Sequence, residues 1–172
     1  MEIPKLETER LLLRAISPED RSVIFENYAD PDVANWFFDQ PFTQIEQADQ
    51  VINDFLEKAA QGKGLAWAIL LKASGEFVGT CSFENFGTTQ QGEIGFDLAK
   101  KYWGHGYMAE ALSEVITYGF TVLELVMIEA DTYSHNSRAR RVLQKLGFKV
   151  DVVREDSHGY SLDKSDWLQN RA

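Results

Sequence analysis

The chain has 172 residues, 44% of them hydrophobic and 12% aromatic, which is enough to bury one sizeable core. Its formal net charge of −10 argues against a general nucleic-acid binder, because neutralising phosphates needs clustered lysine and arginine. The longest apolar run, residues 65–71, is far shorter than the ~20 residues of a membrane-spanning helix, and residues 1–7 lack the apolar stretch of a signal peptide. We therefore expect one domain, residues 1–172, in the cytoplasm, with no nucleic acid or membrane as partner.

Charge is distributed unevenly along the chain. Residues 22–57 contain eight acidic residues and no lysine or arginine. Six basic residues crowd instead into the stretch from Arg138 to Arg154. An acidic early region and a basic late region predict two ligands of opposite charge.

The first elements are predicted from short local signals. The run Leu11–Leu13 is typical of a strand. Residues 17–20, Ser-Pro-Glu-Asp, supply an N-cap, a proline suited to the first helical position and acids in the first turn, so a first helix is expected there. Residues 43–46, Thr-Gln-Ile-Glu, form a capping-box pattern. Apolar residues then recur at helical spacing as far as Gly62, which predicts a second helix.

The middle of the chain has the pattern of strands. Residues 65–72 and 77–83 are strand-like runs separated by Ser74-Gly75, which predicts an antiparallel hairpin. The single cysteine, Cys81, falls in the second run and is better explained as a small core residue than as a nucleophile. Another strand, Glu93–Leu98, is expected after a polar loop.

The later part of the chain alternates between helix and strand patterns. Apolar residues three and four apart from Met108 to Leu123 mark one face of a third helix. Residues 126–132 alternate as a strand does, and the stripe from Ala139 to Leu146 predicts a fourth helix. Gly147-Phe148 is typical of a glycine C-cap with a following hydrophobic contact. A short final strand pair is expected to close the chain.

A glycine turn, residues 103–107 (Trp-Gly-His-Gly-Tyr), stands between the strand at Glu93–Leu98 and the third helix. Free backbone N–H groups at a helix start bind anions, and glycines let the backbone approach a phosphate closely. The pattern alone also suits an ordinary turn. Neither the longer dinucleotide fingerprint nor a P-loop lysine is present, so NAD and ATP are poor candidates.

Motifs spread over nearly the whole chain resemble those of the GNAT N-acetyltransferases, especially the branch that acts on ribosomal-protein N-termini. The matching segments are Thr8–Arg14, Asp30–Val33, Tyr102–Tyr107 and Asn136–Phe148. The resemblance implies acetyl-CoA as the acyl donor. It also implies an α/β (α+β) fold with a mixed central sheet of about six to seven strands flanked by about four helices.

The resemblance also implies where the cofactor lies. In the family fold the strands at 93–98 and 126–132 splay apart, and the pantetheine arm lies between them. Backbone groups of Phe96 and Leu98 would pair with pantetheine, and N–H groups of residues 105–109 would hold the pyrophosphate. The implied cofactor-binding residues are Phe96, Leu98, Gly104, His105, Gly106, Tyr107, Met108, Ala109, Asn136 and Arg141. Met108 stands where many members have glycine or alanine, and we expect its side chain to pack into the core.

Transfer of an acyl group to an amine needs no covalent enzyme intermediate, and the chain has no Gly-x-Ser-x-Gly elbow. Its three histidines show no metal-ligand spacing, so no metal is expected. Several GNAT enzymes carry a general base at the position of Glu93; the alternative is a solvated carboxylate at a strand start. Leu143 stands where many members have a tyrosine acid, which leaves water or a hydroxyl such as that of Ser134 to protonate the thiolate.

The acceptor is the part on which alternatives stay open. The acidic early region would wall the acceptor side in this family, with Trp36 and Phe37 as apolar residues of the wall. This predicts an amine acceptor such as a basic protein N-terminus, although the acids also suit a surface that only aids solubility. The alternatives are a small cationic amine (polyamine, aminoglycoside or amino-acid-like) and a catalytically silent acyl-CoA sensor. Dimers are common among similar proteins, so a homodimer is also an expectation.

Overall fold

The structure is a computed structural model that describes residues 2–86 and 89–171. These residues form an eight-stranded sheet in the order β1-β2-β3-β4-β5-β6-β8-β7, in which β5 and β6 pair in parallel and the other neighbours pair antiparallel. The strands are β1 (Leu6–Glu7), β2 (Leu11–Ala15), β3 (Gly64–Leu71), β4 (Phe77–Glu84), β5 (Gln91–Leu98), β6 (Met127–Tyr133), β7 (Lys149–Val153) and β8 (Ser157–Asp163). The helices are α1 (Arg21–Ala29), α2 (Pro31–Ala34), α3 (Glu46–Ala60), α4 (Tyr107–Thr121), α5 (Ser137–Lys145) and α6 (Lys164–Arg171).

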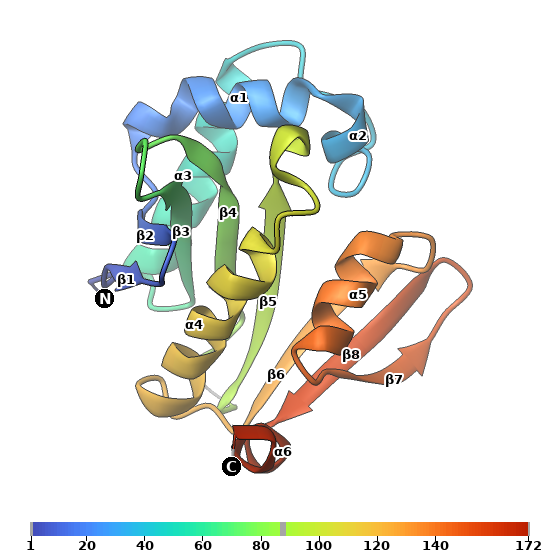
Figure 1. The fold of residues 1–172 in the computed structure, drawn as a ribbon. Coiled ribbons are helices and arrows are strands. Elements are labelled where there is room, and N and C mark those ends of the chain that lie inside the picture. Colours follow the sequence, from blue (N-terminus) through green and yellow to red (C-terminus); the bar gives the residue numbers. More distant parts are fainter. Residues whose placement is uncertain (1, 87–88, 172) are drawn as a thin grey trace.

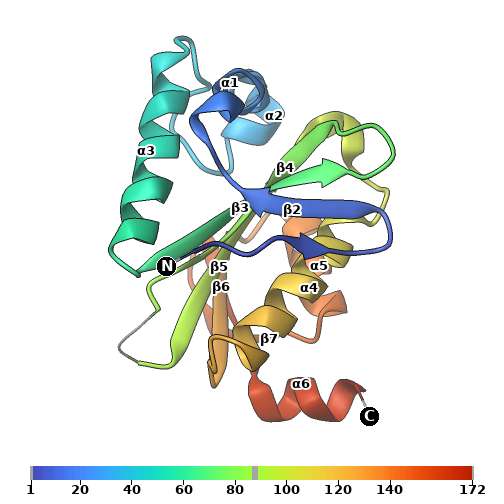
Figure 2. The same ribbon diagram turned by 90° about the vertical axis from the view of Figure 1, so that its left-hand side faces the viewer.

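The sheet is covered on both faces, by α1 and α3 on one side and by α4 and α5 on the other (Figures 1 and 2). Alternate residues of β3 show why. Ala66 and Ala68 pack with the α1–α3 layer, whereas Trp67 and Ile69 pack with the α4 layer. A central strand that is buried on both faces has a continuous apolar sequence, as this one has. None of the described helices is both long and apolar enough to cross a membrane.

The mixed α/β class predicted from the sequence is confirmed, with more elements than expected. The additions are the two-residue β1, the four-residue α2 and the C-terminal α6. The final strand pair is present as β7 and β8, which pair antiparallel. Helix α6 follows β8 directly. Its sequence carries no strong apolar stripe, and none of its residues is fully buried.

Two of the predicted caps are confirmed and one is wrong in detail. Ser17 and Asp20 form a capping box ahead of α1, and Gly147 ends α5 with φ of 91°. The box predicted for residues 43–46 does not form, because α3 begins at Glu46. The side chain of Gln47 accepts the N–H groups of residues 43 and 44 instead, at 2.8 and 3.0 Å.

Candidate functional site

The site begins where the two parallel strands stop pairing. The β5–β6 rungs run from Gln91–Met127 to Glu93–Glu129 and end there. Beyond this point β5 stays paired with β4 as far as Leu98, and β6 stays paired with β8 as far as Tyr133. The strands therefore splay apart, as the family resemblance implied, and Figure 1 shows the gap opening between them.

The hydrogen-bond alternation directs the backbone of Phe96 and Leu98 into this gap. Ala99 donates to the Val78 carbonyl at 2.8 Å, next to the last β4–β5 rung. In an antiparallel ladder alternate residues turn to opposite neighbours, so Phe96 and Leu98 turn away from β4. The Leu98 carbonyl accepts the indole N–H of Trp103 at 2.8 Å. A ligand in the gap thus finds the groups of Phe96 unengaged by β4 and the Leu98 carbonyl shared with Trp103.

The glycine turn leads into α4 with its N–H groups free. Gly104 and Gly106 have φ of 79° and 80°, the left-handed region that glycine adopts without strain. Gly106 is the N-cap, and the first intrahelical bond runs from the Glu110 N–H to the Gly106 carbonyl. The N–H groups at the first three helical positions, residues 107–109, therefore have no intrahelical acceptor. With the helix dipole they suit a phosphate.

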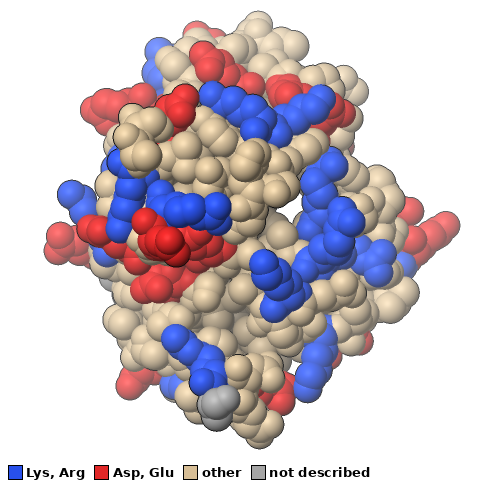
Figure 3. Space-filling model, in the orientation of Figure 1, with Lys and Arg blue, Asp and Glu red and all other residues tan. Residues whose placement is uncertain are grey.

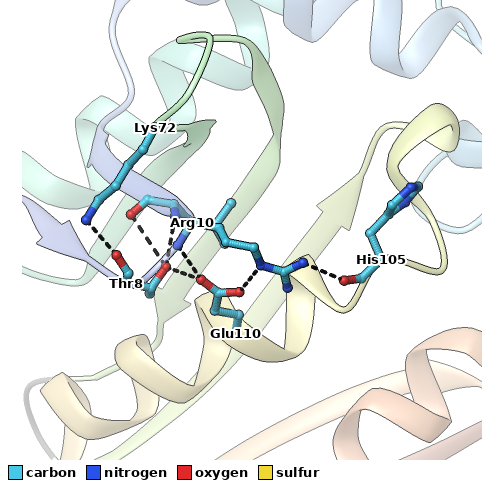
Figure 4. Close-up of polar contacts among 6 residues, drawn as sticks. Thr8, Arg10, Lys72, His105 and Glu110 are labelled. Carbon is cyan, nitrogen blue, oxygen red and sulfur yellow. Dashed lines mark hydrogen bonds and ion pairs between the residues drawn. The ribbon is translucent and has the colours of Figure 1, made fainter.

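Polar contacts from the β1–β2 region hold this turn in place (Figure 4). Arg10 donates through Nη1 to the His105 carbonyl at 3.0 Å and through Nε to Glu110 at 2.7 Å. Glu110 also accepts from the Thr8 hydroxyl at 2.5 Å. In a trans peptide the N–H points opposite to the C=O, so anchoring the His105 carbonyl on Arg10 turns the Gly106 N–H the other way. These contacts fix the direction of the turn's donors.

A cavity of about 560 Å³ lies between the turn and α5. Its lining includes all the predicted cofactor residues except His105, namely Phe96, Leu98, Gly104, Gly106, Tyr107, Met108, Ala109, Asn136 and Arg141. The His105 ring instead stacks on Tyr107 and lies with Nδ1 3.1 Å from the Tyr102 carbonyl. Met108 is 6% exposed and belongs to the core, which confirms the packing predicted for it.

The far wall of this cavity is basic. Arg138, Arg141 and Lys145 of α5 line it, and Figure 3 shows lysine and arginine gathered beside the hollow. The Arg138 guanidinium lies 3.6 Å from the centre of the Trp103 ring, so it bridges the two sides. Asn136 caps α5 by accepting the Ala139 N–H at 3.2 Å, which leaves the amide N–H groups of Asn136 as donors for a ligand. Backbone donors and basic side chains together fit a cofactor with several phosphates.

A second cavity of about 240 Å³ adjoins the first through the gap. Trp36 and Phe37 line both cavities, and their role as a wall for the acceptor stays a prediction. Glu93 lines the second cavity and accepts from the Asn85 amide at 3.1 Å. The side chain of Glu93 is exposed at the rung where the strands diverge, as the alternative of a solvated carboxylate at a strand start describes.

Leu143 is fully buried in the core, so α5 presents no hydroxyl at this point. Ser134 uses its backbone in contacts, donating its N–H to Asp156 and accepting from Arg140. Leu143 has no hydroxyl, and Ser134 is absent from the lining of both cavities.

Asp97 is a site residue that the sequence reasoning missed. It is 5% exposed, lines the larger cavity, and lies between the two residues whose backbones face the gap. Its carboxylate accepts from Asn27 at 2.5 Å, from the Tyr28 hydroxyl at 2.8 Å and from Thr80. Burial raises the pKa of Asp97 to about 6, against the opposing effect of these hydrogen bonds. β5 carries two acidic residues, Glu93 and Asp97, and no sequence signal marks Asp97 as the buried one.

Comparisons with known proteins agree with this geometry. Residues 10–149 match the acetyltransferase (GNAT) domain family. The chain is 34% identical over 152 residues to the uncharacterized N-acetyltransferase p20 of Bacillus licheniformis, covering 88% of this chain and 85% of that protein. It is 26% identical over 180 residues to the [ribosomal protein uS5]-alanine N-acetyltransferase of Escherichia coli. This match covers 96% of this chain and 88% of that protein.

A solved structure shows the same fold. RimL, a ribosomal L7/L12 α-N-protein acetyltransferase in complex with coenzyme A, superposes with a TM-score of 0.84 at 15% identity, over 93% of this chain and 98% of that one. The chain therefore belongs to the GNAT family of acetyltransferases, enzymes that take an acetyl group from acetyl-CoA.

Proposed function

We propose that the protein acetylates a primary amine in the gap between β5 and β6, and that a protein N-terminal α-amine is the first acceptor to test. One observation carries the proposal: the gap joins a cavity lined by backbone donors and basic side chains to a second cavity that holds Glu93. Acetyl-CoA would enter from the α4–α5 side. The amine would enter from the side of Trp36 and Phe37.

In this proposal the cofactor is held mainly by the backbone. The N–H groups of residues 107–109 hold the pyrophosphate, Phe96 and Leu98 pair with pantetheine, and Asn136 donates near the diverging strands. Arg141 adds positive charge at the phosphates. The thioester is then held at the mouth of the second cavity, within reach of an amine beside Glu93.

The amine must lose a proton before it attacks. An α-amine of pKa ~8 costs about 1.4 kcal/mol to deprotonate at pH 7, whereas an amine of pKa ~10.4 costs about 4.6 kcal/mol. Glu93 takes this proton, directly or through water. The nitrogen bonds to the thioester carbonyl carbon and the C–S bond breaks. The proton that the attacking nitrogen then loses passes through water to the departing thiolate, which gives the amide and CoA. An exposed Glu93 suits the easier α-amine better than the lysine-like class.

Names of relatives support the α-amine, since the Escherichia coli protein and RimL are named for ribosomal-protein acceptors. The small-amine alternative rests on the acidic side chains of the acceptor side. Free CoA release from acetyl-CoA would be measured with a panel of peptides and small amines. Glu93→Gln should lower kcat at pH 7 with little change in KM for acetyl-CoA. Glu129→Gln, on the adjacent strand of the same rung, is the matched control and should retain activity.

Two outcomes would contradict the proposal. If the protein binds acetyl-CoA but releases no CoA with any amine, the sensor alternative replaces the enzyme. If Glu93→Gln has the same kcat as the wild type at every pH, Glu93 is not the base. Only the proposed binding of acetyl-CoA would then stand.

A further inference from the structure

The second cavity is walled by aromatic side chains from two distant segments. Trp36 and Phe37 follow α2, and Tyr133 ends β6. Their rings approach across the gap, with Trp36 and Tyr133 at 6.3 Å between ring centres and Trp36 and His135 at 4.9 Å. Phe37 and Tyr133 remain 44% and 43% exposed, which is unusual for large aromatic residues that contact other rings.

The charges of this cavity are few. Two carboxylates line it among the described residues, and one of them, Asp131, is paired with Arg154 at 2.5 Å. Glu93 contacts the neutral amide of Asn85. The cavity thus offers one carboxylate without a cationic partner, which suits one ammonium group. The second ammonium of a diamine would find no other unpaired carboxylate among the described residues that line this cavity.

The size of the second cavity also favours an acceptor with one small group beside the amine. Its volume of about 240 Å³ lies below the ~300–1,000 Å³ of pockets for drug-sized ligands, so it suits a single small group. Aromatic rings stabilise an apolar or aromatic group by area and ring geometry, and they attract a nearby ammonium weakly.

We infer that the acceptor carries an apolar, preferably aromatic, group within a few bonds of the reacting nitrogen, and that Tyr133 helps to set this preference. Two sources share this chemistry: a free arylalkylamine and a peptide whose first residue is aromatic. The inference rests on the proposed function and narrows its acceptor.

The test compares kcat/KM within matched acceptor sets. One set is 2-phenylethylamine, propylamine and 1,4-diaminobutane; the other is a single peptide sequence beginning with Phe or with Ser. We expect kcat/KM to be about tenfold or more higher for the ring-bearing member of at least one set, since one well-packed apolar group gives discrimination of this order. A preference within the amine set would identify a free arylalkylamine as the acceptor, and a preference within the peptide set would identify a peptide whose first residue is aromatic.

Variants of Tyr133 separate recognition from folding. Tyr133→Phe keeps the ring and should keep the preference, whereas Tyr133→Ser should reduce it several-fold through acceptor KM, with KM for acetyl-CoA and the melting temperature unchanged. Tyr133 is the residue to substitute because it lines the second cavity and is absent from the lining of the first, so its replacement should leave the cofactor cavity unchanged.

The outcomes are distinguishable. CoA release with equal kcat/KM for all amines, a preference for the diamine, or a preference that Tyr133→Ser leaves intact would overturn this inference and leave the acetyltransferase proposal standing. No CoA release with any amine would overturn both.

Discussion

Replacing Asp97 by Asn should change how the stability of the protein depends on pH. The folded pKa of Asp97, about 6, lies above its unfolded value of 3.8 because burial disfavours the charged form. For a raised pKa, the stabilising contribution is full below the unfolded value and is lost as pH rises through the folded one. The shift of about two units corresponds to about 3 kcal/mol, most of which is lost between pH 4 and 7.

The assay is urea unfolding of both proteins at several pH values. Other carboxylates titrate in the same range, so the informative quantity is the wild-type minus Asp97→Asn difference in unfolding free energy. This difference should fall by about 2 kcal/mol from pH 4 to pH 7. Asp151→Asn, on the exposed strand β7, controls for the loss of one negative charge. A difference that stays constant with pH, or that rises, would mean that the three hydrogen bonds to Asp97 outweigh its burial.

Three further substitutions test the cofactor side and the core. Arg10→Ala removes the bond that anchors the glycine turn and should raise KM for acetyl-CoA roughly fivefold with kcat little changed; an unchanged KM would refute the anchoring role. Gly106→Ala places a side chain at φ of 80°, at a cost of roughly 1–2 kcal/mol, and should lower both melting temperature and cofactor affinity, whereas Gly62→Ala at φ of 68° should lower the melting temperature alone. Gly119→Ala would put its Cβ 2.6 Å from the Phe83 ring and should destabilise by about 1–3 kcal/mol in thermal melts without changing KM.

Periodicity predicted most elements because each of them satisfies a local rule. The stripe in α4 and the glycine end of α5 are visible within a dozen residues, and the structure has both. The capping box at residues 43–46 satisfied an equally local rule and was wrong. There the chain is fixed by Phe42, whose N–H bonds the Tyr28 carbonyl and whose ring is buried, so the start of α3 is set by tertiary contacts. A cap motif predicts a helix more reliably than it predicts the helix's first residue.

Asp97 and Glu93 show that the burial of a charged side chain cannot be predicted from its position in a strand alone. They lie four residues apart on one strand, on the same face, and the sequence gives no reason to treat them differently. Asp97 is buried because α1 brings Asn27 and Tyr28 over it. Glu93 lies at the last rung between β5 and β6 and is exposed. Burial, and with it the pKa, depends on packing partners far away in the chain.

The same reasoning explains why the cofactor could be predicted before the acceptor. The donors proposed for acetyl-CoA are largely backbone N–H groups, so the glycines that free them are contiguous in sequence and form a readable motif. The acceptor cavity is instead built from side chains of the α2–α3 connection and the end of β6, about a hundred residues apart, which come together only in the fold. Backbone sites depend on local conformation, which short patterns specify. Side-chain sites can change with a few substitutions on the same scaffold, so two members of one family can share the donor cavity and differ at Trp36 and Tyr133.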